Sequence, residues 1–308
     1  MIVVEFRRFQ FQLFERFKMT NFMSPALRTS LLTAFALISF AANSVLNRLA
    51  TSGDTIDAGS YIGIRLVSGA VTLWLLNAIS KKKITFILRG ANPLSAFYLF
   101  LYGVAFSFAY SSLTSGTGAF ILFGTVQTTM LTVVLLRGER PHISEWVGLI
   151  LAASGLVYLV FPSLKSPEPL AAMLMLTAGV AWAFYTLRGK GVEDPLKSTA
   201  INFMLSVPMV LIVNALTVSK AHISTEGVGY AMLSGAIASG IGYAVWYTAL
   251  RGLTATQAAL LQLTVPVLAA LGGVFFIHET ITPRLVVAGF LILCGVALAL
   301  IGKRYFVK

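Results

Sequence analysis

The amino-acid sequence predicts an all-α integral membrane protein with ten transmembrane helices, arranged as two inverted five-helix repeats. Three observations predict this fold: long apolar runs, an internal repeat and an uneven distribution of positive charge. Of the 308 residues, 57% are hydrophobic and 11% are charged, whereas soluble proteins of this size usually carry about twice that charged share. The apolar residues form runs of about 20, the length that crosses a bilayer as a helix.

The internal repeat is visible without any gap. Residues 113–161 align with residues 253–301, 140 positions later. The offset pairs identical residues, among them Leu113 with Leu253, Glu139 with Glu279, and Gly155 with Gly295. Each copy consists of an apolar span, a short charged turn with one glutamate, and a second apolar span. A chain built from two such halves is typical of membrane transporters.

Ten apolar spans follow one another along the chain, and no stretch between them is long enough for a soluble domain. We expect them at 29–49, 59–79, 93–112, 117–136, 143–161, 168–187, 197–217, 227–250, 255–277 and 282–301. The first repeat then occupies 29–162, the second 163–302, and a C-terminal tail 303–308. A basic and aromatic tail occupies 1–28. Its residues 1–23 are expected to be a surface amphipathic helix, a poorly ordered tail, or translated sequence before a true start at Met19 or Met23.

The lysines and arginines predict the orientation of the chain. If the N-terminus is cytoplasmic, 18 of the 23 basic residues fall on the cytoplasmic side and four on the opposite side, with Arg65 inside the second span. Such an excess is the positive-inside signal. It predicts that both termini are cytoplasmic, and it accounts for the net charge of +12 without a nucleic-acid partner. Because each repeat has an odd number of spans, the second repeat must run upside down relative to the first.

Several features resemble one known family. They are the paired units with Glu139 and Glu279, Arg65 in the second span, the segment Ala42-Asn43-Ser44 followed by Arg48, and its counterpart from Trp182 to Arg188. Together they resemble the drug/metabolite transporter superfamily in its ten-span, EamA-type form, over nearly the whole of residues 29–302. Within it, the chain is most similar overall to bacterial aromatic amino acid and methyl viologen exporters.

This resemblance implies a substrate cavity between the two halves, lined by spans 1, 3, 4, 6, 8 and 9. It also implies alternating access and export across a bacterial inner membrane, with the lipid bilayer as the surroundings. In resembling proteins the fifth and tenth helices serve oligomer contact, so the chain is expected to be a monomer or a homodimer. The glycines Gly155 and Gly295 in these helices are expected to be structural.

Charged and catalytic groups are scarce in the predicted spans. All eleven acidic residues lie in the tail, the loops or at span ends, which disfavours a proton-coupled antiporter of the small four-span type, because that type needs a carboxylate inside the membrane. A clustered basic pair for a phosphate is also missing. Cys294 is the single cysteine, and no HExxH, Ser-His-Asp or phosphate-loop pattern occurs. We expect no enzyme, no cofactor and no metal.

Neutral polar and aromatic side chains inside the spans are the candidate substrate contacts. Asn43 and Asn47 share one face of the first span with Ser39, and that face should point inward because an unpaired amide is unfavourable in lipid. The alternative is a hydrogen bond between helices. Aromatic walls suit planar or apolar side chains, and the alternative for them is ordinary packing. The candidate set is Asn43, Asn47, Tyr102, Phe106, Trp182, Tyr185, Tyr243, Trp246 and Gln262.

Arg65 and Pro266 are two special positions in the spans. Arg65 could neutralise a substrate carboxylate, pair with backbone carbonyls or Asp57, or extend toward the membrane interface; a structural role is favoured. Pro266 removes the backbone hydrogen bond to the carbonyl of Gln262, in the middle of the ninth span. The predicted function is export of aromatic and other apolar amino acids, with a multidrug or other small-metabolite exporter as the alternative. Coupling to protons and facilitative transport are both left open.

Overall fold

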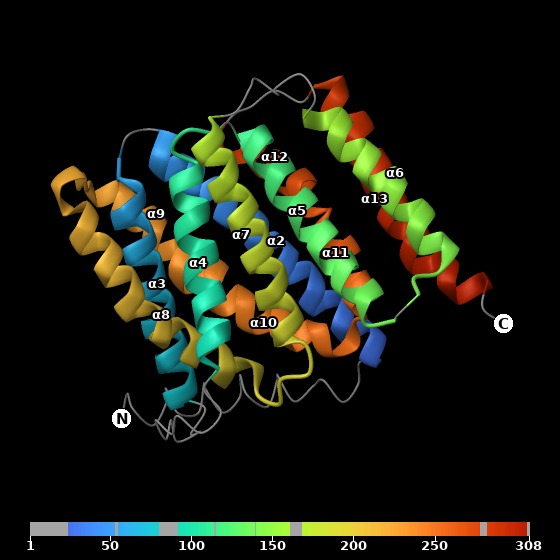
Figure 1. Ribbon diagram of the computed structural model, residues 1–308, viewed down its shortest axis with the longest axis horizontal. Coiled ribbons are helices and arrows are strands. Elements are labelled where there is room, and N and C mark those ends of the chain that lie inside the picture. Colours follow the sequence, from blue (N-terminus) through green and yellow to red (C-terminus); the bar gives the residue numbers. More distant parts are fainter. Residues whose placement is uncertain are drawn as a thin grey trace, which may run out of the picture.

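The computed structural model describes residues 24–52, 55–79, 92–113, 115–138, 140–160, 168–277 and 282–306. Residues 1–23 of the predicted tail, Glu139 and Glu279 lie outside this part of the chain. Within it, the regular structure is helical (Figure 1). The helices are α2 (Pro25–Ser52), α3 (Ala58–Ile79), α4 (Pro93–Ala109), α5 (Ser115–Leu136), α6 (Ile143–Val160), α7 (Pro169–Gly189), α8 (Pro195–Thr217), α9 (Thr225–Leu233), α10 (Gly242–Ala249), α11 (Ala255–Gln262), α12 (Val265–Ile277) and α13 (Pro283–Phe306).

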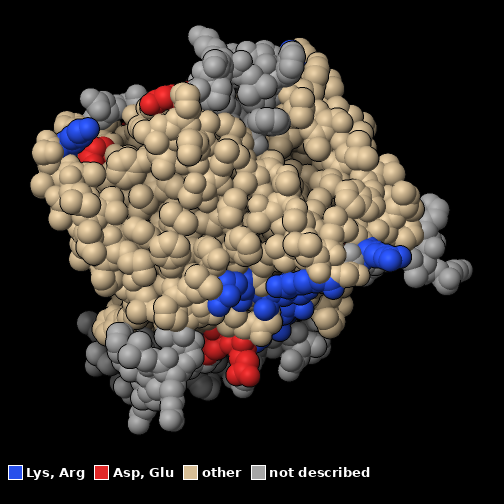
Figure 2. Space-filling model, viewed as in Figure 1, with Lys and Arg blue, Asp and Glu red and all other residues tan. Residues whose placement is uncertain are grey.

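A helix occupies each of the predicted spans. Among the described residues, seven helical segments are long and apolar enough to cross a membrane, and three shorter apolar helices cover 93–109, 121–136 and 143–158. Large apolar side chains cover the outside: Leu136, Leu216 and Phe275 are 82%, 79% and 73% exposed. Figure 2 shows most of the lysines and arginines of one face in a band near its lower edge and another at the upper left, with a wide uncharged region between them. The chain is a multi-pass helical membrane protein; the ten-span count, the inverted repeat and the orientation stay predictions.

Local sequence explains where several helices begin. Proline is the first residue of α2, α4, α7, α8 and α13, a position where its fixed φ fits and its missing N–H costs nothing. Asn92 caps α4 by accepting a hydrogen bond from the Ser95 backbone, and Asp194 caps α8 in the same way. Thr254 and Gln257 form a reciprocal capping box at the start of α11.

Two of the predicted spans are not continuous α-helices. The eighth contains a π-helical segment, η4 (Ser234–Ile241), between α9 and α10. The ninth is divided into α11 and α12 at residues 263–264. Pro266 explains this second break, because it cannot donate a backbone hydrogen bond to Gln262. Both irregular segments belong to helices that surround the centre of the protein (Figure 1).

Helices α6 and α13 lie side by side at one end of the molecule (Figure 1). A Cβ atom at Gly148 of α6 would overlap the carbonyl oxygen of Gly295 of α13, and a Cβ at Gly295 would lie 2.6 Å from the Ala152 backbone nitrogen. A Cβ at Gly155 would lie 2.9 Å from the Cβ atom of Leu291. The absence of side chains therefore lets the two backbones touch. This gives Gly155 and Gly295 a packing role within one chain.

The other helices form the main body. Helix α4 packs along α7, α3 packs along α8 and η4, and α5 packs along α7. Helix α2 runs through this group and contacts α9, η4, α10 and α12. Phe40, near the middle of α2, packs against Trp182 of α7 and Tyr243 of α10, where several predicted site residues converge.

Candidate functional site

A cluster of aromatic rings fills the centre of the main body. Phe40 of α2, Tyr102 of α4, Trp182 of α7 and Tyr243 of α10 are all buried. The Trp182 ring centroid lies 4.8 Å from those of both Tyr102 and Tyr243, and the edge-on Phe40 ring lies 5.1 Å from it. Edge-on and tilted contacts at these distances are the favoured geometries for aromatic pairs. Four helices are thereby joined around one tryptophan.

A small cavity lies inside this cluster. Its volume is ≈ 20 Å³, which is room for about one water molecule. Its described lining residues carry no charge; they are Phe40, Ser44, Tyr102, Phe106, Leu122, Phe123, Trp182 and Tyr243. They come from α2, α4 and α5 of the first predicted repeat and from α7 and α10 of the second. The cavity is therefore lined by helices from both predicted halves of the chain and encloses little free space.

The position of Trp182 is fixed by a hydrogen bond behind the cavity wall. Its indole N–H donates to Oε1 of Gln262 on α11, over 2.5 Å. The amide nitrogen of Gln262 donates in turn to the Ala258 carbonyl, over 3.1 Å. Gln127 of α5 similarly donates to the Ala259 carbonyl. The glutamines therefore tie α7 and α5 to α11 on the outer side of the cavity.

Arg65 of α3 lies directly behind three of the lining rings. Its Nε donates to the hydroxyl of Ser239 over 2.9 Å, and its Nη2 donates to the hydroxyl of Tyr243 over 2.8 Å. Its guanidinium carbon lies 5.8 Å from the ring centroids of both Tyr102 and Phe106, within cation–π range. The side chain is 2% exposed. Arg65 therefore does not extend to the interface, and it does not pair with Asp57; its partners are the site's own side chains.

Asn43 joins the same buried network through the π-helical segment. Its Oδ1 accepts hydrogen bonds from Ser234, over 2.6 Å, and from Ser239, over 3.1 Å. These serines are five residues apart, a spacing that would place them about 140° apart around an α-helix. The wider π-helix, with its i→i+5 bonds, brings them to one face. Helices α2, α3 and η4 are linked in this way.

The predicted site residues separate into three groups. Tyr102, Phe106, Trp182 and Tyr243 line the cavity. Gln262, Tyr185 and Trp246 lie one layer behind: Gln262 binds Trp182, Tyr185 packs 5.6 Å from it, and Trp246 packs 5.4 Å from Phe40. Asn43 and Asn47 are buried but are not among the described lining residues.

The sequence reasoning missed Phe40, Leu122 and Phe123, and did not single out Ser44 as a site residue. Two signals could have found some of them. Phe40 and Ser44 are four residues apart and so share a helix face, next to the face of Ser39 and Asn43. Leu122 is the counterpart of Gln262 at the 140-residue offset.

Hydrogen bonds join distant segments of the chain at both ends of the helices around this core. At one end, the loop before α3 meets the loop before α9: the Asp57 backbone N–H donates to the His222 carbonyl, and the His222 backbone N–H donates to Oδ2 of Asp57, each over 3.0 Å. Ile56 and Ile223 form an isolated antiparallel bridge there. Partial burial acts to raise the pKa of Asp57, but hydrogen bonds from Ser60, His222 and Gly59 together hold that pKa below its usual 3.8.

The opposite end is tied by Arg188 at the end of α7. Its Nη2 donates to Oδ1 of Asn92 over 2.8 Å, and its Nε donates to the Ser95 hydroxyl over 3.1 Å, both at the start of α4. Two polar contacts between segments far apart in sequence therefore lie at opposite ends of the helices that line the cavity.

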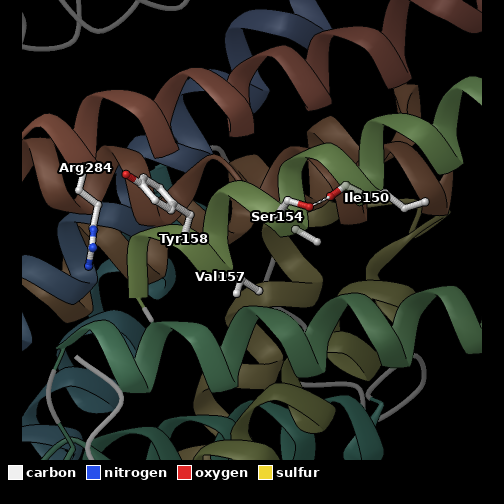
Figure 3. A pocket seen from close by; sticks show the side chains of 6 residues that line it. Ile150, Ser154, Val157, Tyr158 and Arg284 are labelled. Carbon is white, nitrogen blue, oxygen red and sulfur yellow. Dashed lines mark hydrogen bonds between the residues drawn. The ribbon is translucent and has the colours of Figure 1, made fainter. Parts of the chain in front are cut away.

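A larger pocket of ≈ 550 Å³ lies away from this site, on α6 and α13 (Figure 3). Its walls are mostly apolar: the Ser154 hydroxyl is bonded to the Ile150 carbonyl, and Arg284 stacks on Tyr158 at 5.2 Å. None of the predicted site residues lines it. Among the described residues, no group of three or more His, Cys, Asp or Glu side chains could hold a metal ion.

Comparison with known proteins agrees with this architecture. Residues 169–301 match the EamA-like transporter family. An uncharacterized protein of Pseudomonas aeruginosa is 45% identical over 90% of this chain and 96% of its own length. The threonine/homoserine exporter RhtA of Escherichia coli K12 is 28% identical over 74% of this chain and 77% of its own length. A crystal structure superposes with a TM-score of 0.75 at 16% identity, over 90% of this chain and 98% of that one, which concerns the fold alone. The chain belongs to the EamA-like transporter family.

Proposed function

We propose that this transporter exports amino acids with aromatic or other apolar side chains from the cytoplasm across a bacterial inner membrane. The observation that carries the proposal is the enclosed aromatic cavity, to which both halves of the chain contribute side chains. Flat, apolar walls bind apolar side chains by area burial and ring contact. The described lining residues include no carboxylate, so an organic cation would find no counter-charge there.

A relative supports the amino acid class. RhtA, by its name an exporter of threonine and homoserine, is 28% identical to this chain. Both of those substrates are small and polar, whereas Phe40, Tyr102, Phe106, Trp182 and Tyr243 present rings to the cavity. The same amino acid backbone with a larger, apolar side chain fits these walls better.

The proposed mechanism is alternating access by ten spans in two inverted repeats, with both termini in the cytoplasm. The cavity of ≈ 20 Å³ is far too small for an amino acid, so the two halves must separate on one side to admit one. Inverted repeats allow the cavity to open to either side of the membrane in turn, because each half can adopt the conformation of the other around a fixed central site.

Counterflow in proteoliposomes tests this proposal. Vesicles loaded with phenylalanine should take up labelled phenylalanine saturably, with competition by tryptophan and leucine. Uptake measured with and without a pH gradient separates facilitative transport from proton coupling. Absence of phenylalanine uptake under both conditions would contradict the substrate class, and competition by organic cations alone would favour a multidrug exporter of this fold.

A matched pair of substitutions tests the cavity itself. Trp182→Phe shrinks the central wall and removes the bond to Gln262, so the apparent KM for phenylalanine should rise by about tenfold, equivalent to ~1.4 kcal/mol. Trp74→Phe makes the same change on a side chain that is 47% exposed on the outside of α3, and transport should be unchanged. If the two variants have the same apparent KM for phenylalanine, the substrate does not bind in this cavity.

A further inference from the structure

Arg65 is a cation without a described anionic partner in the centre of a membrane protein. The polar side chains around it include the neutral Ser239 and Tyr243, which accept hydrogen bonds from it, and the neutral Tyr102. Among the described residues, no carboxylate forms a salt bridge with it. Its Nη1 is buried and has no hydrogen-bond partner, although a guanidinium presents five N–H donors. Buried charges are normally paired, so this site is electrostatically incomplete as it stands.

The incomplete cation is next to the aromatic cavity. Tyr102, Phe106 and Tyr243 contact the guanidinium and also line the cavity. The Tyr243 hydroxyl accepts a hydrogen bond from Arg65, and the Tyr102 hydroxyl interacts with both Tyr243 and Arg65. A negative group in the cavity would therefore meet two tyrosine hydroxyls that a buried guanidinium polarises.

The surroundings of Arg65 hold it in place for such a role. Ser239, which accepts from Nε of Arg65, itself donates to Asn43. Asn43 is fixed by Ser234 from the other end of η4. The aromatic rings on the opposite side leave little freedom to the planar group. A guanidinium fixed in this way keeps its unpaired Nη1 in place as a charged donor for a carboxylate oxygen.

We propose that Arg65, together with the Tyr243 hydroxyl, binds the carboxylate of the transported molecule and so makes a free carboxylate a requirement for binding. This inference rests on the proposed function, because it assumes that the central cavity is the substrate site. It deepens that function by naming the group that is recognised: zwitterions and organic anions bind, and organic cations are excluded by a fixed positive charge.

The first test compares ligands on the unaltered protein. Binding of phenylalanine, 3-phenylpropionate and phenylalaninamide is measured by calorimetry on the purified protein in lipid nanodiscs. The first two carry a carboxylate and should bind, whereas the amide, nearly identical in shape, should bind at least ~30-fold more weakly. Equal affinity for phenylalanine and its amide would overturn the proposal.

The second test uses variants with a matched control. Arg65→Gln should weaken phenylalanine binding by ~30-fold and leave the amide unchanged or tighter, because the cation that repels it is gone. Arg65→Lys keeps the charge without the fork and should be intermediate. Tyr243→Phe should show a smaller loss restricted to carboxylates. Arg284→Gln removes a guanidinium that stacks on Tyr158 beside the outer pocket and should bind all three ligands as the unaltered protein does.

The outcomes separate this inference from the proposed function. The unaltered protein could bind carboxylates in an Arg65-dependent way and yet transport no phenylalanine in vesicles. That result would support the Arg65 site and contradict the export of amino acids. If Arg65→Gln transports phenylalanine with an unchanged KM, the proposed function stands and the Arg65 site is contradicted. Threonine and threoninamide test whether the ligand is a polar amino acid instead. Tighter binding of threonine than of its amide that depends on Arg65 would support the Arg65 site and change the proposed substrate class. Equal affinity for the acid and its amide, with both phenylalanine and threonine, would overturn the Arg65 site.

Discussion

At the scale of single residues, the hydrogen bond between Trp182 and Gln262 organises the cavity. Trp182 contacts Phe40, Tyr102 and Tyr243 at ring distances of about 5 Å, so its orientation determines the shape of the site. A buried indole N–H needs an acceptor, and Gln262 provides it from behind the wall. In the proposed site, Gln262 would therefore be a positioning residue that holds Trp182 in its orientation.

The coupling between these two residues can be measured. Gln262→Leu leaves the Trp182 N–H buried without an acceptor and should lower the free energy of unfolding by ~1–3 kcal/mol. Trp182→Phe should cost less in the Gln262→Leu background than in the unaltered protein, because the bond is already lost. Chemical unfolding in detergent of both single variants and the double variant gives this difference. Strictly additive effects would contradict the role assigned to Gln262.

The aromatic part of the site could be predicted from the sequence, and the polar part could not. Tyr102, Phe106, Trp182 and Tyr243 were recognisable as large rings in the middle of apolar spans, and all four line the cavity. The hydrogen bonds of Arg65 are with Ser239 and Tyr243, more than 170 residues away. Such long-range contacts leave no local pattern, so the sequence alone does not reveal these partners. Phe40 is not predicted either, because the prediction for its helix rests on the polar side chains and Phe40 lies on the neighbouring face.

At the scale of elements, the predicted spans agree with the observed helices because apolar length is a local property. The π-helical form of η4 was not predicted, since it depends on what surrounds the helix. A Cβ atom at Gly235 would overlap the Arg65 carbonyl oxygen and the Ser68 hydroxyl of α3. The π-helix thus approaches α3 closely on one side and presents Ser234 and Ser239 to Asn43 on the other.

The contact between α6 and α13 gives a prediction for an element pair. Gly148→Ala inserts a methyl group against the Gly295 carbonyl and the Ala299 backbone, and overpacking of this kind should cost ~1–3 kcal/mol of stability. Gly124→Ala on α5 meets nothing within 4 Å and should be neutral or slightly stabilising, since alanine favours a helix by up to ~1 kcal/mol over glycine. Thermal unfolding of the purified proteins measures both. A Gly148→Ala variant as stable as Gly124→Ala would show that the two helices can separate freely.

At the scale of the whole molecule, polar contacts close the two ends of the helices that surround the aromatic core. Asp57 and His222 join the loops before α3 and α9 at one end, and Arg188 joins α7 to α4 at the other. Each contact links one predicted repeat to the other. Alternating access requires that one of them opens while the other stays closed. The charge asymmetry of the sequence predicts which end faces the cytoplasm, but the contacts themselves bridge distant loops and had no sequence signal.

Locking one end should therefore stop transport without removing the site. Ile56 and Ile223 pair as antiparallel neighbours, at a separation that suits a disulfide. Cys294 is the single native cysteine, so Ile56→Cys with Ile223→Cys in a Cys294→Ala background allows one defined cross-link. Oxidation should abolish counterflow of labelled phenylalanine, and reduction should restore it, while each single-cysteine variant should transport under both conditions.

The result also distinguishes opening from collapse. If the cross-link acts by holding this end closed, the oxidised protein should unfold at a higher temperature than the reduced protein, because the link restricts the unfolded chain. Lost transport with a lowered unfolding temperature would instead indicate a distorted fold. Full transport by a completely cross-linked sample would mean that the loops at Asp57 and His222 stay together throughout the transport cycle. The two halves would then separate at other contacts.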